Sequence, residues 1–467
     1  MLFNSLIFVA FAIVFFLVFK IIGGNIKGRL IWLTAASFFF YGWWDWRFLS
    51  LILISGLIDY FAALSIARNP DRKRFFLVFS VLANLGSLSL FKYSGFIAEN
   101  IDTILGLRGS FSLAANIPEF FLITPVGISF YTFQSMSYTF DVYRGKLQPT
   151  KNFMQFFAYL SMFPQLVAGP IVRADSMLPQ LLKVSPVTKE KRWDGFQLIV
   201  RGYFKKMVIA DNLAPLVMAA FGAPEINSST MFWWGTIIAF AFQIYCDFAG
   251  YSDIARGLAH WMGYDFPDNF NHPYISTSIR EFWERWHISL STWFRDYLYI
   301  PLGGNRKGKY RSYINLWITM VVSGLWHGAA WTFVAWGGVH AFFASFERFT
   351  RWPEKLGRSA IAKFAGWVLV TFQVLVAWVF FRAETIDQAW KILQVMFSFQ
   401  GPFNFGWGLD ATIFISIMIL RELFAALHFD EQFKGKHPVV EMLFYAILIV
   451  AIIFFRGEGS EFIYFQF

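Results

Sequence analysis

Two histidines stand in sequence surroundings where an imidazole could do chemistry. The first, His327, lies in Ser-Gly-Leu-Trp-His-Gly, inside an apolar run with no charged residue from Asn315 to Ala341. An ionisable side chain at membrane depth is costly and marks a candidate functional site. Away from bulk water an imidazole favours its neutral form, which can accept a proton from a hydroxyl or thiol. We therefore predict a general base at His327; the alternative is a histidine that hydrogen-bonds between helices and aids packing.

The second histidine, His287, lies in the most polar long segment of the chain, 263–311. If the stretch around it forms one helix, a broad face of that helix carries Arg280, Trp283, Glu284, His287 and Ser291. In one interpretation this face lines a polar cavity beneath His327. In the other, its charges pair with each other and with lipid headgroups, as structural charge networks often do.

An acidic residue, Asp247, follows another apolar run. A buried carboxylate could orient a histidine or bind a proton, or it could cap the end of a helix, and the spacing does not decide between these roles. The chain has one cysteine, Cys246. Since no grouping of His, Cys, Asp or Glu has metal-ligand spacing, we predict no bound metal. There is no phosphate-binding loop or dinucleotide fingerprint, which argues against an ATP-driven pump.

The elements that must position these residues are membrane helices. The 467 residues are 57% hydrophobic and 15% charged, more apolar than a soluble core requires. A helix needs roughly 20 apolar residues to cross the hydrocarbon core. Apolar runs recur at 1–19, 31–44, 48–66, 75–91, 121–140, 207–223, 229–246, 312–346, 364–381, 411–420 and 439–455. We predict an all-α, polytopic membrane protein of about ten to twelve transmembrane or re-entrant helices, forming one domain over 1–467.

The basic residues lie in short loops between these runs. The net charge of +10 therefore indicates membrane topology and anionic headgroups, not nucleic acid. Prolines interrupt the apolar segment near 152–172, which predicts a re-entrant segment. The segment near 275–300 is too charged to span and too aromatic for water, which predicts interfacial helices. The run 312–346 is long enough for one long crossing or a pair broken at a glycine.

Taken together, these residues resemble the membrane-bound O-acyltransferase family, in its bacterial branch that acetylates alginate, peptidoglycan or cellulose. The likeness covers most of the chain and ends near Phe380–Glu384. Its motifs include Pro125–Phe130, Asp141–Gly145, Asp247–Asp253, Glu281–Gly304 and Ser323–Gly328. The resemblance implies many helices around a central funnel or tunnel. It also implies that His327 is the catalytic histidine and that His287 occupies the second signature position.

The activity implied by the resemblance is membrane O-acetyltransfer in a bacterial cytoplasmic (inner) membrane. The chain would have no bound cofactor and would take acetyl from a cytoplasmic thioester, with acetyl-CoA as donor substrate. It would pass the acetyl group across the membrane to a periplasmic or extracellular acetyltransferase partner protein or to the glycan itself. D-alanyl transfer to teichoic acid, the reaction of a sister branch, stays open. So do two other classes: a transporter or flippase, and a non-catalytic scaffold for a periplasmic acetyltransferase.

Each candidate residue has an expected role in this reaction. His327 would act as general base or briefly carry the acyl group, and His287 would orient it or stabilise the oxyanion. Tunnel-lining or substrate-binding roles are expected for Trp286, Trp326, Arg280, Glu284, Ser291, Arg295 and Asp247. Arg295, with Arg306 and Lys307, could attract the phosphates of coenzyme A. The alternative for these three cations is the ordinary charge bias of cytoplasmic loops.

Overall fold

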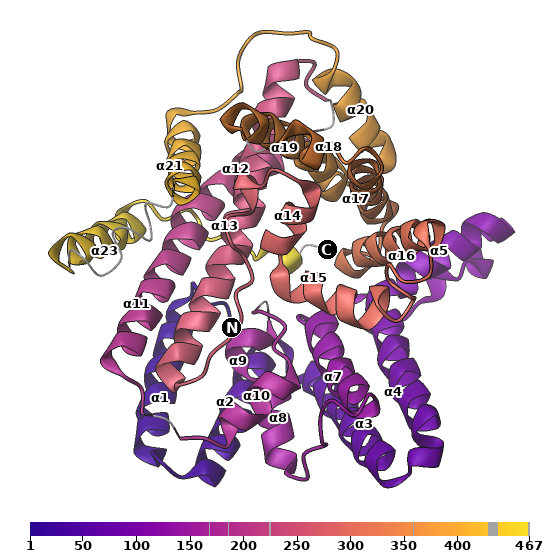
Figure 1. The fold of residues 1–467 in the computed structure, drawn as a ribbon, viewed down its shortest axis with the longest axis vertical. Coiled ribbons are helices and arrows are strands. Elements are labelled where there is room, and N and C mark those ends of the chain that lie inside the picture. Colours follow the sequence, from indigo (N-terminus) through magenta and orange to yellow (C-terminus); the bar gives the residue numbers. More distant parts are fainter. Residues whose placement is uncertain (168, 185, 224–225, 358, 428–437, 466–467) are drawn as a thin grey trace. The chain divides into compact units, whose positions relative to one another are not determined.

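The computed structural model describes residues 1–467 except 168, 185, 224–225, 358, 428–437 and 466–467, and those described residues form helices and connecting loops without a strand (Figure 1). The all-α prediction is confirmed. The chain divides into two compact units, one of residues 1–196 with 254–267 and one of residues 197–253 with 268–467. Helices α11 (Lys189–Tyr203) and α13 (Thr230–Met262) contribute residues to both. That 1–467 forms a single domain stays a prediction.

The first unit contains the N-terminal helices. They are α1 (Leu6–Ile22), α2 (Ile26–Asp45), α3 (Leu49–Arg68), α4 (Lys73–Leu88), α5 (Ser94–Leu105), α6 (Glu119–Leu122), α7 (Ile128–Tyr143), α8 (Phe153–Ser161), α9 (Phe163–Leu166) and α10 (Ala174–Leu181). Phenylalanine rings hold α1, α2 and α9 together: the ring of Phe163 lies 4.9 Å from Phe15 and 5.4 Å from Phe40. The helices α8 and α9 fill most of the interrupted segment near 152–172, whose re-entrant placement stays a prediction.

A buried polar network joins α3, α4 and α7 in this unit. Asp59 accepts hydrogen bonds from the hydroxyls of Ser80 and Thr139 and from the side-chain amide of Asn84. The Thr139 bond measures 2.8 Å and the Asn84 bond 2.9 Å. Asn84 in turn accepts from Ser55. Since three donors surround one buried carboxyl group, the network fixes how these helices face each other.

The second unit contains the remaining helices. They are α12 (Asp211–Phe221), α14 (Ile279–Arg285), α15 (Ile288–Phe294), α16 (Lys309–His327), α17 (Trp331–Thr350), α18 (Trp352–Leu356), α19 (Ala360–Arg382), α20 (Ile386–Met396), α21 (Leu409–Ala426) and α23 (Pro438–Phe454), with most of α13. Two π-helical turns, η6 (Phe204–Ala210) and η8 (Arg295–Tyr299), follow α11 and α15. The core is aromatic and aliphatic, with Trp233, Trp286, Trp336 and Trp378 fully buried.

The run 312–346 is a broken pair of helices, the second of the two predicted possibilities. Helix α16 ends at His327, Gly328 is extended, and α17 begins at Trp331. The two helices approach so closely that a Cβ on Gly324 would overlap the backbone of Phe333, and one on Gly337 would overlap the backbone of Met320. Glycines therefore allow the tight turn that leaves His327 at a helix end.

Among the described residues, three helical segments are long and apolar enough to cross a membrane: Ile26–Arg68, Pro70–Leu105 and Ala360–Arg382. The apolar helices Leu6–Ile22 and Pro438–Phe454 are shorter. These segments agree with a polytopic membrane protein. The total of ten to twelve membrane segments stays a prediction.

The segment near 275–300 differs from the single helix considered in the sequence analysis. The helix α14 ends at Arg285, and a new helix, α15, begins at Ile288. Between them His287 has the left-handed backbone conformation, with φ 42°. A left-handed residue breaks the helical repeat, so the shared face running from Arg280 to Ser291 is wrong.

Candidate active site

The candidate active site lies within the second unit, around the end of α16. The side chain of His327 is 3% exposed. Its imidazole ring packs edge-on against Trp336, with ring centroids 5.0 Å apart, and lies 5.4 Å from Phe381. The ring of Tyr464 completes this surround at 5.6 Å. An imidazole enclosed by aromatic rings has little water to hydrate its charged form, so the arrangement favours a neutral base.

The second histidine, His287, faces the same region. Its ring centroid lies 6.5 Å from that of His327, and its side chain is 1% exposed. The left-handed backbone at His287 turns the chain between α14 and α15. The helix break, and not a helix face, therefore brings His287 to His327. The sequence prediction that the two histidines belong to one region is supported by this geometry, although the helical route to it was wrong.

Asn269 holds the His287 ring. The amide oxygen of Asn269 lies 3.0 Å from Nδ1 of His287 and also accepts a hydrogen bond from the Ser289 hydroxyl at 2.9 Å. Its amide nitrogen donates to Ser252 at 3.1 Å. Because the amide oxygen is an acceptor, Nδ1 carries the hydrogen and Nε2 carries the lone pair. Burial lowers the pKa of His287 to about 3, so this tautomer is neutral at pH 7.

Sequence reasoning missed Asn269, Trp336, Phe381 and Tyr464. His340, which lies one helical turn after Trp336 on α17, was not among the sequence candidates either. His340 is fully buried, its ring is 4.8 Å from Trp336 and 4.9 Å from Trp283, and neither ring nitrogen has a hydrogen-bond partner among the described residues. The i,i+4 spacing of Trp336 and His340 is the one local signal that could have linked His340 to the site.

The predicted tunnel-lining residues fall into different surroundings. Trp286 and Trp326 are buried, and the Trp326 ring lies 6.1 Å from His287. The Ser291 hydroxyl donates to the Trp286 carbonyl at 3.1 Å, a local bond at the start of α15.

The charged candidates lie farther out. Arg280 and Glu284 pair with each other at 2.9 Å with side chains 83% and 60% exposed. Arg295 pairs with Asp296 at 2.7 Å and is also exposed. These pairs fit the alternative in which the charges partner each other. A lining role for the three residues stays a prediction.

The carboxylate of Asp247 pairs with lysine. Its Oδ1 lies 2.7 Å from Nζ of Lys206, and its Oδ2 accepts a hydrogen bond from the backbone N–H of Ile463 at 2.7 Å. Lys206 also pairs with Asp211 at 2.8 Å. Asp247 therefore holds a distant backbone segment, a role that its local sequence did not suggest. The residue that orients the histidine is Asn269.

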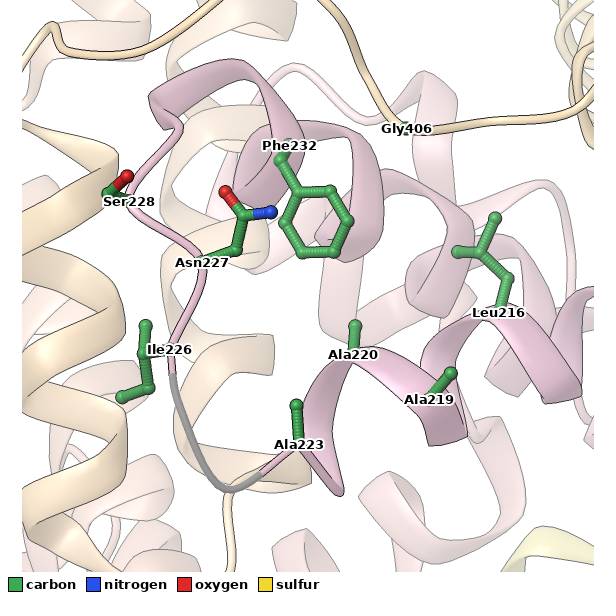
Figure 2. A pocket seen from close by; sticks show the side chains of 9 residues that line it. All are labelled: Leu216, Ala219, Ala220, Ala223, Ile226, Asn227, Ser228, Phe232 and Gly406. Atoms are coloured by element: carbon green, nitrogen blue, oxygen red, sulfur yellow. The ribbon is translucent and has the colours of Figure 1, made fainter.

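A metal centre and a separate pocket are two other places in the second unit where chemistry could occur. Within the described residues, no three or more His, Cys, Asp or Glu side chains are placed to hold a metal ion. A pocket of about 680 Å³ lies between α12 and α13, and Figure 2 shows it lined by small and apolar side chains such as Ala220 and Phe232, with Asn227 among them. Since neither His287 nor His327 belongs to its lining, we do not assign the reaction to this pocket.

Comparisons with known proteins identify the family of this chain. Residues 146–382, which contain both histidines, match the model of the membrane-bound O-acyltransferase family. The chain is 40% identical to a probable alginate O-acetylase of Azotobacter vinelandii, over 79% of this chain and 73% of that protein. It is 40% identical to the probable alginate O-acetylase of Pseudomonas aeruginosa, over 85% of this chain and 75% of that protein. With the peptidoglycan O-acetyltransferase of Helicobacter pylori the identity is 35%, over 86% and 80%.

Proposed function

Because this chain belongs to the membrane-bound O-acyltransferase family, and is thus a membrane O-acyltransferase, we propose that it transfers acetyl groups for the O-acetylation of an extracytoplasmic polysaccharide. The observation that carries the proposal is the buried pair His287 and His327, enclosed by aromatic rings. Relatives named for alginate and peptidoglycan acetylation support acetyl as the acyl group and a glycan as the final acceptor.

The proposed reaction begins with His327 as general base. Its imidazole takes the proton of an acceptor hydroxyl, whose oxygen attacks the thioester carbonyl of the donor. The tetrahedral intermediate then expels the thiolate, and the protonated imidazole returns the proton to sulfur. An ester forms, a thioester breaks, and the free histidine is restored. The aromatic surround supports this role, since exclusion of water protects the thioester from hydrolysis.

The tautomer of His287 favours one of its two expected roles. With Nδ1 donating to Asn269, Nε2 is an acceptor and cannot donate a hydrogen bond to an oxyanion. We therefore assign His287 to accepting a hydrogen bond, from the His327 ring or from the acceptor hydroxyl. In either case it orients the proton transfer. The oxyanion would need other donors.

The donor, the acceptor and the compartment complete the proposal. The donor is an acetyl thioester, acetyl-CoA, that reaches the site from the cytoplasm, and the chain lies in a bacterial inner membrane. Acetyl leaves on the outer side to a partner acetyltransferase or to the glycan. Exposed cations such as Arg295 could attract the phosphates of the donor.

The test follows radiolabelled acetyl from acetyl-CoA in purified protein with an alginate or peptidoglycan acceptor. We expect labelled ester with the wild-type chain and none with His327→Ala. Thioester cleavage is the decisive readout: a transporter would move substrate without cleaving it, and a scaffold would bind its partner equally well without His327. Supplying a D-alanyl thioester in a parallel reaction distinguishes acetyl from D-alanyl transfer. Full acetylation by a folded His327→Ala protein would contradict the proposal.

A further inference from the structure

A buried ionic cluster holds one peptide segment in the second unit. Lys206 lies on the π-helical turn η6, Asp211 begins α12, and Asp247 lies on α13. The Lys206 ammonium contacts Asp211 at 2.8 Å and Asp247 at 2.7 Å, and all three side chains are at most 4% exposed. Two carboxylates therefore share one cation out of water. Such a cluster is costly unless further donors complete it.

The segment 456–465 supplies those donors. The Ser460 hydroxyl donates to Asp211 at 2.6 Å, and the backbone N–H of Ile463 donates to Asp247 at 2.7 Å. The Ser460 carbonyl accepts the third ammonium bond of Lys206 at 3.0 Å. With both carboxylates and the cation completed by the same short segment, releasing that segment would leave buried charges without hydrogen bonds.

A glycine allows the segment to lie this close. The N–H of Gly457 donates to the Met207 carbonyl at 2.9 Å. A Cβ built on Gly457 would lie 2.7 Å from the backbone carbon of Asp211, closer than packed atoms allow. The position therefore accepts only glycine while the segment is docked. This contact is independent of the charges in the cluster.

The far end of the segment reaches the candidate active site. The ring of Tyr464 lies 5.6 Å from His327 and 4.6 Å from Phe248, which itself contacts His287 edge-on at 4.6 Å. Phe462 stacks on Tyr464 and also packs against Tyr251. The backbone bond to Asp247 lies one residue before Tyr464. The geometry of this bond therefore sets where the Tyr464 ring lies against His327 and Phe248.

We infer that Lys206, Asp211 and Asp247 are positioning residues of the acyltransfer site, and that they act by docking the segment 456–465 so that Tyr464 closes the aromatic surround of His327. The role rests on the proposed function. It adds that a region distant in sequence from the histidine motifs is part of the site. A displacement of about 1 Å in a catalytic constellation can cost on the order of a hundredfold in rate.

The experiment measures docking and acetyl transfer separately in the full chain. In a Cys246→Ala background, Ile463→Cys places the single thiol on a side chain that is 2% exposed. Maleimide labelling of the folded protein then reports release of the segment. Gly457→Ala is compared with Gly408→Ala, because a Cβ on Gly408 meets nothing within 4 Å. We expect Gly457→Ala, and not Gly408→Ala, to raise the labelling rate about tenfold. The same variant should lower kcat more than it changes KM for the donor.

A second matched pair tests the hydrogen bond to Asp211. Ser460→Thr keeps the hydroxyl and Ser460→Val replaces it with a methyl of similar shape. We expect wild-type labelling and kcat for the threonine variant, and release with loss of kcat for the valine variant. Asp247→Asn is compared with Asp253→Asn, whose ion pair with Lys205 joins the same two elements. Thermal unfolding of each variant identifies any that fail to fold.

The outcomes separate the two proposals. Unchanged labelling in Gly457→Ala and Ser460→Val would overturn the docking role. Increased labelling with full kcat would overturn the positioning role. If the wild-type chain transfers no acyl group, the proposed function fails, while the labelling arm still decides whether the cluster docks the segment.

Discussion

Two buried polar regions of this protein differ in how completely they are hydrogen-bonded. In the first unit, Asp59 receives three donors from α4 and α7, and nearly every member of that network has a partner. In the second unit, His340 has none among the described residues, although it is as deeply buried as Asp59. A completed network fixes a structure, whereas an incomplete one leaves polar atoms for a substrate or water to complete. From this difference we expect the Asp59 region to be structural and the histidine region to be the one that binds a substrate.

The largest expected effect is on activity in the incomplete region. His327→Ala removes the proposed general base and should lower kcat by about a thousandfold. Because the change also removes a buried ring that packs against Trp336 and Phe381, we expect a lower thermal unfolding midpoint as well, and kcat is therefore compared per folded molecule. Acetyl release from labelled acetyl-CoA and a melting curve are measured on the same preparation. A kcat within a few-fold of wild type would refute the catalytic assignment.

The matching change in the Asp59 network should lower stability and leave activity unchanged. Asp59→Ala leaves the Ser80 and Thr139 hydroxyls and the Asn84 amide without their acceptor, at a cost of about 3 kcal/mol. We expect a clear fall in the unfolding midpoint and unchanged kcat per folded molecule. Reversible unfolding in detergent measures the first, and active-site-normalised turnover the second. A stable but inactive variant would place Asp59 in the reaction and weaken the comparison.

Acid should destabilise the histidine region. Burial holds the pKa of His287 at about 3, whereas an unfolded histidine titrates near 6.5. Below pH 6.5 the unfolded chain therefore binds more protons than the folded chain. The free energy of unfolding then decreases as the pH is lowered, by about 2 kcal/mol from this group at pH 5. Unfolding at pH 7.5 and pH 5 measures the loss. His287→Asn should reduce the pH dependence; an equal slope in both proteins would contradict it.

Asn269 tests the orientation of His287. Asn269→Ala removes the acceptor of the Nδ1 proton and should lower kcat about tenfold, which corresponds to about 1.4 kcal/mol in the barrier. Asn269→Asp, which keeps an acceptor oxygen, should retain more activity than the alanine variant. Steady-state kinetics of the two variants decide this. Equal losses would mean that Asn269 matters only for packing.

The smallest effect is expected at His340. His340→Phe replaces a buried ring without hydrogen bonds by an apolar ring of similar shape, which should be neutral or stabilise by up to about 1 kcal/mol. In the Asp59 network, by contrast, we expect no apolar replacement to be neutral or stabilising. If His340 serves a substrate, kcat or KM changes while stability does not fall. A strongly destabilised variant would show that His340 belongs with the completed kind of network.

Local sequence predicted much of the fold because membrane helices have a local signal. The runs 31–44, 48–66, 75–91 and 364–381 lie within helical segments that are long and apolar enough to span. The glycines of 312–346 left open one long crossing or a broken pair, and the structure has the break at Gly328. The single helix through His287 was predicted wrongly. Its i,i+4 charge pairs do form, but within α14 alone. The left-handed residue that ends the helical pattern, His287, has no signal in the composition.

By itself the sequence determined that this is a membrane protein, that its fold is all-α, and that the His327 imidazole lies within an apolar segment. Hydropathy and helical period are properties of neighbouring residues, and they carry these conclusions. Only the tertiary structure decided which groups meet that imidazole: the Asn269 that orients His287, the Trp336 ring, and the segment whose Ile463 N–H binds Asp247 across 216 residues of sequence. Contacts over such separations depend on how the whole chain packs, and no local pattern records them.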